Sequence, residues 1–177
     1  MKIGLCGTVS CGKTTLVNAL KQIDQFKDYE TATERSKYLR DQGISLNTDS
    51  TLKGQLVFAA ERSIELMKPN IITDRTIYDV CAFTLSAKSI GWHEKRQFTE
   101  LLMSLRDDYD VIIYVSPEGV DIEDNKVRTT DVKYREQIDF TIKEMLVEYP
   151  PKKLITVKGP TEHRIEVILK EIFKETV

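Results

Sequence analysis

Hydrophobic positions along this chain follow two spacings that alternate from one end to the other. Between short apolar runs, apolar residues return every three or four positions, which is the spacing of one face of a helix. This spacing predicts helices at residues 13–23, 34–40, 52–68, 76–89, 94–106, 134–146 and 165–173. The apolar runs contain β-branched residues and predict strands at residues 2–6, 27–31, 70–74, 110–116 and 154–157.

Strands that alternate with helices are typical of a parallel sheet covered on both faces. The pattern therefore predicts a three-layer α/β protein with five parallel strands and right-handed crossovers. Ligands of such folds bind at the carboxyl ends of the strands. Because neither a repeat nor a linker interrupts the pattern, we expect residues 1–177 to form a single domain.

The first expected strand is followed by GTVSCGKT (residues 7–14), which satisfies G-x-x-x-x-G-K-[ST]. A phosphate-binding P-loop lies directly after a buried strand and before a helix, as this motif does. Its glycines let the backbone approach phosphates, and N–H groups at the helix N-terminus attract the anion. We expect Lys13 to reach the β and γ oxygens and Thr14 to hold Mg²⁺. The predicted nucleotide-binding residues of this loop are Gly7, Ser10, Cys11, Gly12, Lys13, Thr14 and Thr15.

Other motifs separate the classes of P-loop protein. A GTPase switch needs the guanine-reading motif N-K-x-D, but Asn125-Lys126 is followed by Val127-Arg128. A motor ATPase normally has an apolar strand that ends in paired acidic residues, and none of the expected strands does so. The pattern therefore favours a small kinase with the P-loop NTPase fold.

Positive support for a kinase comes from the strand at residues 70–74, which ends in Asp74 and Arg75. The Asp74 carboxylate suits Mg²⁺ or its waters, and the planar Arg75 guanidinium suits bidentate contacts to an acceptor or a phosphate. The alternative is structural, because an aspartate after a strand often caps the next helix and a neighbouring arginine pairs with it. The P-loop upstream favours the functional interpretation.

Together these motifs resemble the P-loop nucleoside and nucleotide kinase superfamily, most closely its small thymidylate-kinase-like and nicotinamide-riboside-kinase-like members in phages and bacteria. Besides the P-loop, the similar segments are 34–37 (ERSK), 73–76 (TDRT) and 127–131 (VRTTD). The resemblance spans nearly the whole chain and implies ATP and Mg²⁺ as cofactors. Lys37 stands where relatives often carry an arginine and Arg35 comes two places earlier, so either cation is a candidate for substrate contact.

The resemblance also implies further site residues. Glu34, after the second strand, would be the base for an acceptor hydroxyl, with Glu30 and Asp74 as the alternatives. The polar segment at residues 116–135 would be a lid whose Arg128 and Arg135 neutralise charge on the transferring phosphoryl group. Gly159 and Thr161, after the last strand, would lie beside the adenine. The predicted catalytic set is Lys13, Glu34, Asp74, Arg75, Arg128 and Arg135, with Thr14 and Asp74 at the metal.

Charge and composition limit the partners and the location. The 26 Lys and Arg against 28 Asp and Glu give a formal charge of -2, which argues against a surface that wraps nucleic acid. The apolar runs are too short to span a bilayer, no signal peptide is evident, and the three cysteines have no disulfide or metal-ligand pattern. We expect a cytoplasmic protein, in the host cytoplasm if a phage encodes it, with no membrane partner.

The leading hypothesis is a kinase that transfers the γ-phosphoryl group of ATP to a nucleoside hydroxyl or to a deoxynucleoside monophosphate. One alternative keeps this chemistry but takes a hydroxymethylated pyrimidine, 5-hydroxymethyluracil, in phage DNA as the acceptor, as some similar phage proteins do. Another alternative is a module that binds nucleotide as a signal and transfers nothing. The acceptor stays open at this stage, and so does the oligomeric state, which includes a homodimer.

Overall fold

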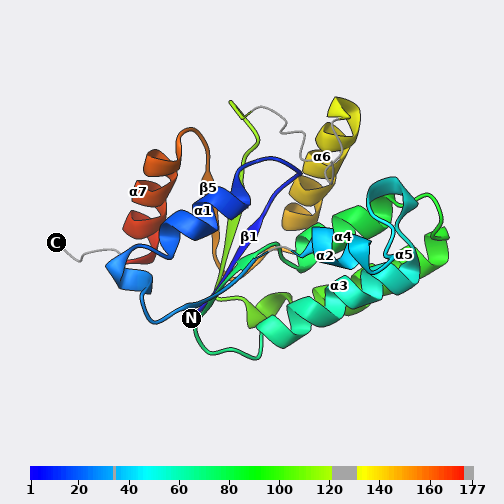
Figure 1. Ribbon diagram of the computed structural model, residues 1–177, viewed down its shortest axis with the longest axis horizontal. Helices are drawn as coiled ribbons and strands as arrows, with labels where there is room; N and C mark the ends of the chain where they lie inside the picture. The colour runs from blue at the N-terminus through cyan, green and yellow to red at the C-terminus, as the bar shows by residue number, and fades with distance from the viewer. Residues whose placement is uncertain (34, 121–130, 174–177) are drawn as a thin grey trace.

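A parallel β-sheet forms the centre of the computed structural model, which describes residues 1–33, 35–120 and 131–173 (Figure 1). The strands are β1 (Lys2–Cys6), β2 (Glu30–Ala32), β3 (Ile71–Asp74), β4 (Val111–Val115) and β5 (Leu154–Val157). They lie in the order β2-β3-β1-β4-β5, and every neighbouring pair is parallel. The predicted five-stranded parallel sheet is confirmed, and its central strand is the one that leads into the P-loop.

Helices connect the strands within the described part of the chain. They are α1 (Lys13–Leu20), α2 (Ser36–Asp41), α3 (Leu52–Glu65), α4 (Ile77–Ser86), α5 (Trp92–Met103), α6 (Val132–Glu148) and α7 (Thr161–Ile172). The described residues also form three short 3-10 helices: η1 (Asp24–Phe26), η2 (Asn47–Asp49) and η3 (Arg106–Asp108). No helix in the described ranges combines the length and the hydrophobicity that a membrane span requires.

Each helix begins or ends a few residues away from the position that the hydrophobic pattern predicts, and two of these differences have a clear cause. Helix α1 ends at Leu20, and the apolar residue beyond it, Ile23, belongs to the turn that leads into η1. Helix α7 begins at Thr161 instead of residue 165, because its first turn is polar and gives no periodic signal. Pro160 precedes that turn, and proline is well tolerated at a helix N-terminus.

The sheet separates two layers of helices, as predicted. In Figure 1, α1 and α7 lie on one side of the strands, and α3 to α6 lie on the other. Successive side chains of a strand point to opposite faces, so Ile3 and Leu5 of β1 pack in the core beneath α1 and α7. Cys6 packs in the other core, with Tyr78 of α4 and Ile138 of α6. Both faces of the sheet are therefore covered.

Gly4 of β1 lets the layer that contains α4 approach the sheet closely. A Cβ atom at this position would lie 2.5 Å from Thr76 Cγ2 and 2.7 Å from Tyr109 Cε1. Thr76 is the N-cap of α4, and Tyr109 is fully buried. The absence of a side chain at Gly4 therefore fixes where α4 begins, directly after the Asp74-Arg75 pair.

Candidate active site

The P-loop connects β1 to α1 and curls around the side chain of Lys13. Lys13 Nζ donates hydrogen bonds to the carbonyl oxygens of Gly7 (2.6 Å) and Thr8 (2.7 Å). Ser10 and Gly12 have φ angles of 54° and 89°, so left-handed residues interrupt the loop and turn its N–H groups into a concave arrangement. Such an arrangement at the N-terminus of a helix binds anions such as phosphate.

Thr14 and Asp74, the two residues predicted to hold a metal, are hydrogen-bonded to each other beside this loop. Thr14 Oγ1 donates to Asp74 Oδ2 at 2.5 Å, which brings the first turn of α1 to the end of β3. A hydroxyl and a carboxylate are oxygen ligands of the kind that Mg²⁺ prefers, and Mg²⁺ usually keeps waters and substrate phosphates as its other ligands. The residues present therefore fit Mg²⁺.

Asp79 links the P-loop to the start of α4. Its carboxylate accepts hydrogen bonds from the backbone N–H of Gly7 (3.2 Å), and from the N–H (2.8 Å) and hydroxyl (3.0 Å) of Thr76. Burial raises the pKa of Asp79, and the positive charges of Lys13 and Arg75 oppose that rise. Asp79 was not among the predicted site residues, although T-x-x-D at residues 76–79 has the spacing of a helix capping box.

Arg75 has an unusual backbone conformation. Its φ angle is 94°, in a region where a side chain is strained, and its N–H donates to the carbonyl of Leu5 (3.0 Å). The guanidinium lies 4.8 Å from the centre of the Phe83 ring and is largely buried. Strained residues that the surrounding structure holds in place are concentrated at functional sites.

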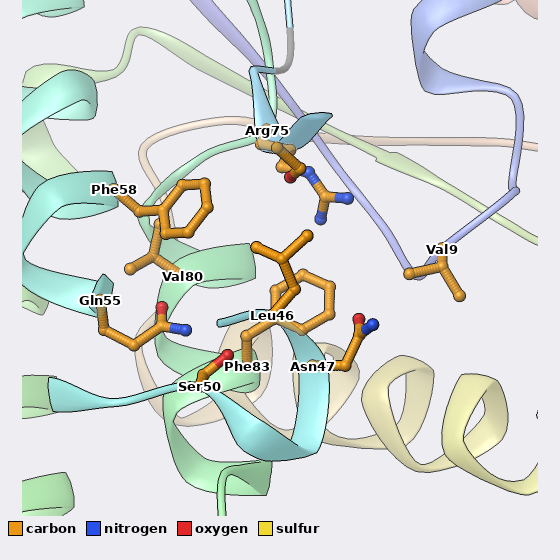
Figure 2. A pocket seen from close by; sticks show the side chains of 10 residues that line it. Val9, Leu46, Asn47, Ser50, Gln55, Phe58, Arg75, Val80 and Phe83 are labelled. Carbon is orange, nitrogen blue, oxygen red and sulfur yellow. The ribbon is translucent and has the colours of Figure 1, made fainter. Parts of the chain in front are cut away.

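Arg75 also lines an apolar cavity (Figure 2). Helices α3 and α4 supply its apolar walls through Phe58, Val80 and Phe83. In Figure 2 the Arg75 guanidinium points into this cavity from the end of β3. The remaining lining residues are Val9, Ser36, Leu46, Asn47, Ser50 and Gln55.

Gln55 is one of the buried polar residues that line this cavity. It lies on α3, its side chain is 3% exposed, and its amide points into the space between the walls (Figure 2). Among the described residues, no hydrogen bond to the Gln55 side chain is formed. A buried amide normally has partners, and its neighbouring donor and acceptor match the edge of a nucleobase.

Another cavity, larger than that of Figure 2, lies beside the P-loop and has a volume of about 660 Å³. It is called the larger cavity below. It is lined by the P-loop and the start of α1, by Gly119 and Val120, and by the segment that follows β5. The predicted residues that it brings together are Ser10, Gly12, Thr14, Thr15, Gly159 and Thr161. Cys11 and Lys13 line the small cavity between Thr14 and Arg75.

Two arginines from the C-terminal half reach the P-loop. Arg135, a predicted lid residue, donates to the carbonyls of Val9 and Ser10, both at 3.2 Å. Arg164 of α7 donates to the carbonyl of Cys11 at 2.8 Å. Glu34, Arg128 and lid residues 121–130 lie outside the described residues.

Sequence reasoning missed Gln55 and Arg164 as well as Asp79. Both lie on helices at positions that point inward: Arg164 precedes the buried Ile168 by four residues, and Gln55 precedes the buried Ala59 by four. A polar side chain on the apolar face of a helix is the signal that could have found them, because burial of such a group requires a partner.

This fold, with a phosphate-binding loop after its central strand, defines a P-loop NTPase. More narrowly, the chain belongs to a family of AAA domains, whose family model matches residues 2–164. No curated protein has a significantly similar sequence.

Solved structures with the same fold include deoxyadenosine kinase from M. mycoides. The structure with the products dCMP and a flexible dCDP has a TM-score of 0.68 and 18% identity, covering 98% of this chain and 99% of that chain. The dCTP complex has a TM-score of 0.65 and the dATP complex 0.63, each at 19% identity, covering 98% of this chain and 100% of that chain. The resemblance to small P-loop kinases is thus confirmed at the level of the fold.

Proposed function

We propose that this protein is a kinase that transfers the γ-phosphoryl group of ATP to a nucleoside or nucleotide. The observation that carries the proposal is that Arg75 lines two cavities at once. One holds Lys13, Thr14 and Asp74 of the phosphate site, and the other is the apolar cavity of Figure 2. A donor phosphate and a second molecule would therefore meet at Arg75. A motor or a nucleotide sensor has no need of a second molecule there.

The chemistry of the apolar cavity supports a nucleobase as the part of the acceptor that binds there. Phe58, Val80 and Phe83 offer flat or apolar surfaces, and aromatic rings stack on bases. Gln55 supplies a donor and an acceptor for the base edge, while Arg75 faces the end from which phosphate would be transferred. The structural relative from M. mycoides is a deoxyadenosine kinase, which agrees with this substrate class.

We assign the transfer step as follows. The acceptor oxygen attacks the γ phosphorus of ATP, and the bond from that phosphorus to the bridging oxygen of ADP breaks. Where the acceptor is a hydroxyl, its proton passes to Glu34. Glu34 follows β2, and Ser36, two residues later, lines the acceptor cavity. Lys13 and Arg75 neutralise the charge that spreads over the phosphoryl oxygens.

The metal and the lid complete the proposed site. Thr14 and Asp74 would hold Mg²⁺, which would neutralise the β and γ phosphates. Arg128 would approach the phosphoryl group from the lid. Arg135, which is hydrogen-bonded to P-loop carbonyls, would help to neutralise the charge of that group. Gly159 and Thr161 would lie beside the adenine in the larger cavity.

This function is tested by measuring the transfer of labelled γ-phosphate from ATP to a panel of acceptors in a buffer that contains Mg²⁺. The panel contains deoxynucleosides, deoxynucleoside monophosphates and duplex DNA with 5-hydroxymethyluracil. We expect transfer to a free nucleoside or nucleotide and its loss in Lys13→Ala, which removes the charge at the phosphate. Transfer to the DNA alone would replace the free acceptor by the DNA acceptor. Tight ATP binding without transfer to any acceptor would refute the kinase and leave a nucleotide sensor.

Glu34→Gln tests the base separately. A hydroxyl acceptor loses a proton during transfer and needs a base, whereas a phosphate acceptor is already ionised. General-base catalysis contributes about 10²–10⁴-fold, so we expect kcat on a nucleoside to fall by about that factor and kcat on a monophosphate to fall far less. Small and equal losses on both acceptors would remove Glu34 as the base.

Lys37 and Arg35 are tested by a second pair of variants, Lys37→Gln and Arg35→Gln. The variant with the higher KM for the acceptor identifies the cation that contacts the acceptor.

A further inference from the structure

Three consecutive carbonyl oxygens of the P-loop accept hydrogen bonds from two arginines that are distant in sequence. Arg135 of α6 donates through Nε to Val9 O and through Nη2 to Ser10 O, both at 3.2 Å. Arg164 of α7 donates through Nη1 to Cys11 O at 2.8 Å. Hydrogen bonds from a charged donor are about twice as strong as neutral ones, so these contacts restrain the loop strongly.

These contacts determine where the loop's N–H groups point. In a trans peptide the C=O and the N–H point in opposite directions, and the described residues contain no cis peptide bond. The carbonyls of Val9, Ser10 and Cys11 share their peptide planes with the N–H groups of the following residues, which end at Gly12. Within the described ranges, none of these N–H groups donates to a protein atom. They face away from the arginines and remain available to an anion.

The same arginines connect the P-loop to the two loops that follow β4 and β5. Arg164 Nε donates to Gly159 O at 2.8 Å, and its Nη2 donates to Ser116 O at 3.3 Å. Arg135 Nη2 donates to Val120 O at 2.8 Å. Each arginine therefore joins segments that line the larger cavity, so the shape of this cavity depends on both.

Arg164 also places a buried positive charge next to the phosphate site. Its side chain belongs to a residue that is 3% exposed, and no carboxylate in the described part of the chain forms an ion pair with it. A buried charge is costly unless it is compensated, and here the carbonyl dipoles compensate it only in part. A phosphate bound to the loop would supply the complementary charge.

We propose that Arg164 and Arg135 are positioning residues that turn the P-loop N–H groups toward the nucleotide phosphates, with Arg164 the more important because it is buried. This proposal rests on the proposed function only in requiring that the larger cavity binds ATP. It concerns the affinity for phosphate and makes no statement about the acceptor.

Calorimetric titration with MgATP and with inorganic tripolyphosphate tests the proposal. Hydrogen bonds to charged groups contribute about 1.5–3 kcal/mol, so we expect Arg164→Gln to raise Kd for both probes about tenfold or more. Arg164→Lys, which keeps the charge, should lose less. Lys170→Gln, an exposed position on the same helix, is the matched control and should change neither Kd. The Kd of the acceptor should stay constant in all three variants.

Three results would overturn the proposal. An unchanged Kd in Arg164→Gln, with wild-type protein binding ATP, refutes it and leaves the kinase standing. Weaker ATP binding with unchanged tripolyphosphate binding shows that Arg164 affects only the binding of the adenine, through Gly159. An equal fall in acceptor affinity shows a general loss of structure. If wild-type protein binds neither probe, the proposed function itself fails.

Arg135→Gln gives an independent measurement if Arg164→Gln does not fold. A positioning role predicts that Kd rises by similar factors for ADP and ATP, because the N–H groups between Val9 and Gly12 serve both ligands. A direct contact of Arg135 with the γ-phosphate predicts weaker ATP binding with ADP unchanged, and that result would overturn its positioning role.

Discussion

At the scale of single residues, Arg75 combines a strained backbone with a place between two cavities of the candidate site. A side chain at φ 94° costs free energy, and glycine would avoid this cost. The strain is tolerated because the Leu5 carbonyl holds the N–H and Thr73 Oγ1 donates to the Arg75 carbonyl at 2.9 Å. Under the proposed function, an arginine is required here because its guanidinium lies between the phosphate site and the proposed acceptor cavity.

The Arg75→Gly variant separates strain from function. Relief of the strain gains about 1 kcal/mol, and loss of the cation–π contact with Phe83 costs a similar amount. We therefore expect the free energy of unfolding in urea to change by less than about 1 kcal/mol, while kcat falls about hundredfold or more. Arg75→Ala is the control, because it removes the same side chain and keeps the strain. An alanine variant as stable as the glycine variant would contradict this explanation.

At the scale of elements, the sequence predicts best those parts whose signal is local. Strand β5 begins and ends where its apolar run does, and β4 differs from its run by one residue at each end. Strand β2 is only three residues long and is half-exposed, so it has hardly any hydrophobic pattern, and its position depends on pairing with β3. The P-loop was found because its motif is continuous. The sequence did not reveal the apolar wall that α3 and α4 form in the cavity of Figure 2, because this wall depends on how the two helices pack together.

The contact between β1 and α4 yields a prediction at this scale. Gly4→Ala would place a methyl group within 3 Å of Thr76 and the Tyr109 ring, and both are fixed in the core. Overpacking of this kind costs about 1–3 kcal/mol, so we expect a lower urea midpoint with an unchanged m-value. Transfer activity should fall too, because α4 would shift with Arg75 before it and Asp79 in its first turn.

Gly91→Ala is the control for that variant. Its added methyl group would meet the flexible carboxylate end of Glu94, which can move aside. The cost should stay below about 1 kcal/mol, the usual price of alanine at a helix N-cap. Equal stability of the two alanine variants would show that the close packing at Gly4 has no energetic consequence.

At the scale of the whole molecule, the site is assembled from both halves of the chain. The residues up to position 83 supply the P-loop, the proposed metal ligands and the wall of the proposed acceptor cavity, and the sequence motifs indicated the first two of these. Arg135 and Arg164 come from helices more than a hundred residues beyond the P-loop. The motifs indicated Arg135 only as a lid residue and did not indicate Arg164, because the fold alone brings α6 and α7 to the loop.

A buried cluster of charges behind β3 makes the stability of the whole molecule depend on pH. Arg62 of α3 donates to the Asp74 carbonyl at 3.4 Å and binds Glu65 at 2.5 Å. Burial raises the pKa of Glu65 from 4.5 to about 7, with Glu61 and Asp74 adding to the rise and Arg62 opposing it. The folded protein therefore holds a proton on Glu65 more tightly than the unfolded chain does.

A raised pKa in the folded state stabilises the protein fully below the unfolded pKa, and this contribution is lost as the pH rises to about 7. Wild-type protein should lose about 3 kcal/mol of unfolding free energy through Glu65 across this window, since one pKa unit corresponds to about 1.4 kcal/mol. Glu65→Gln stays neutral, so its stability relative to wild type should increase with pH. Urea unfolding at several pH values measures this difference, with the exposed Glu144→Gln as control. A difference that stays constant with pH would show that Glu65 is ionised throughout.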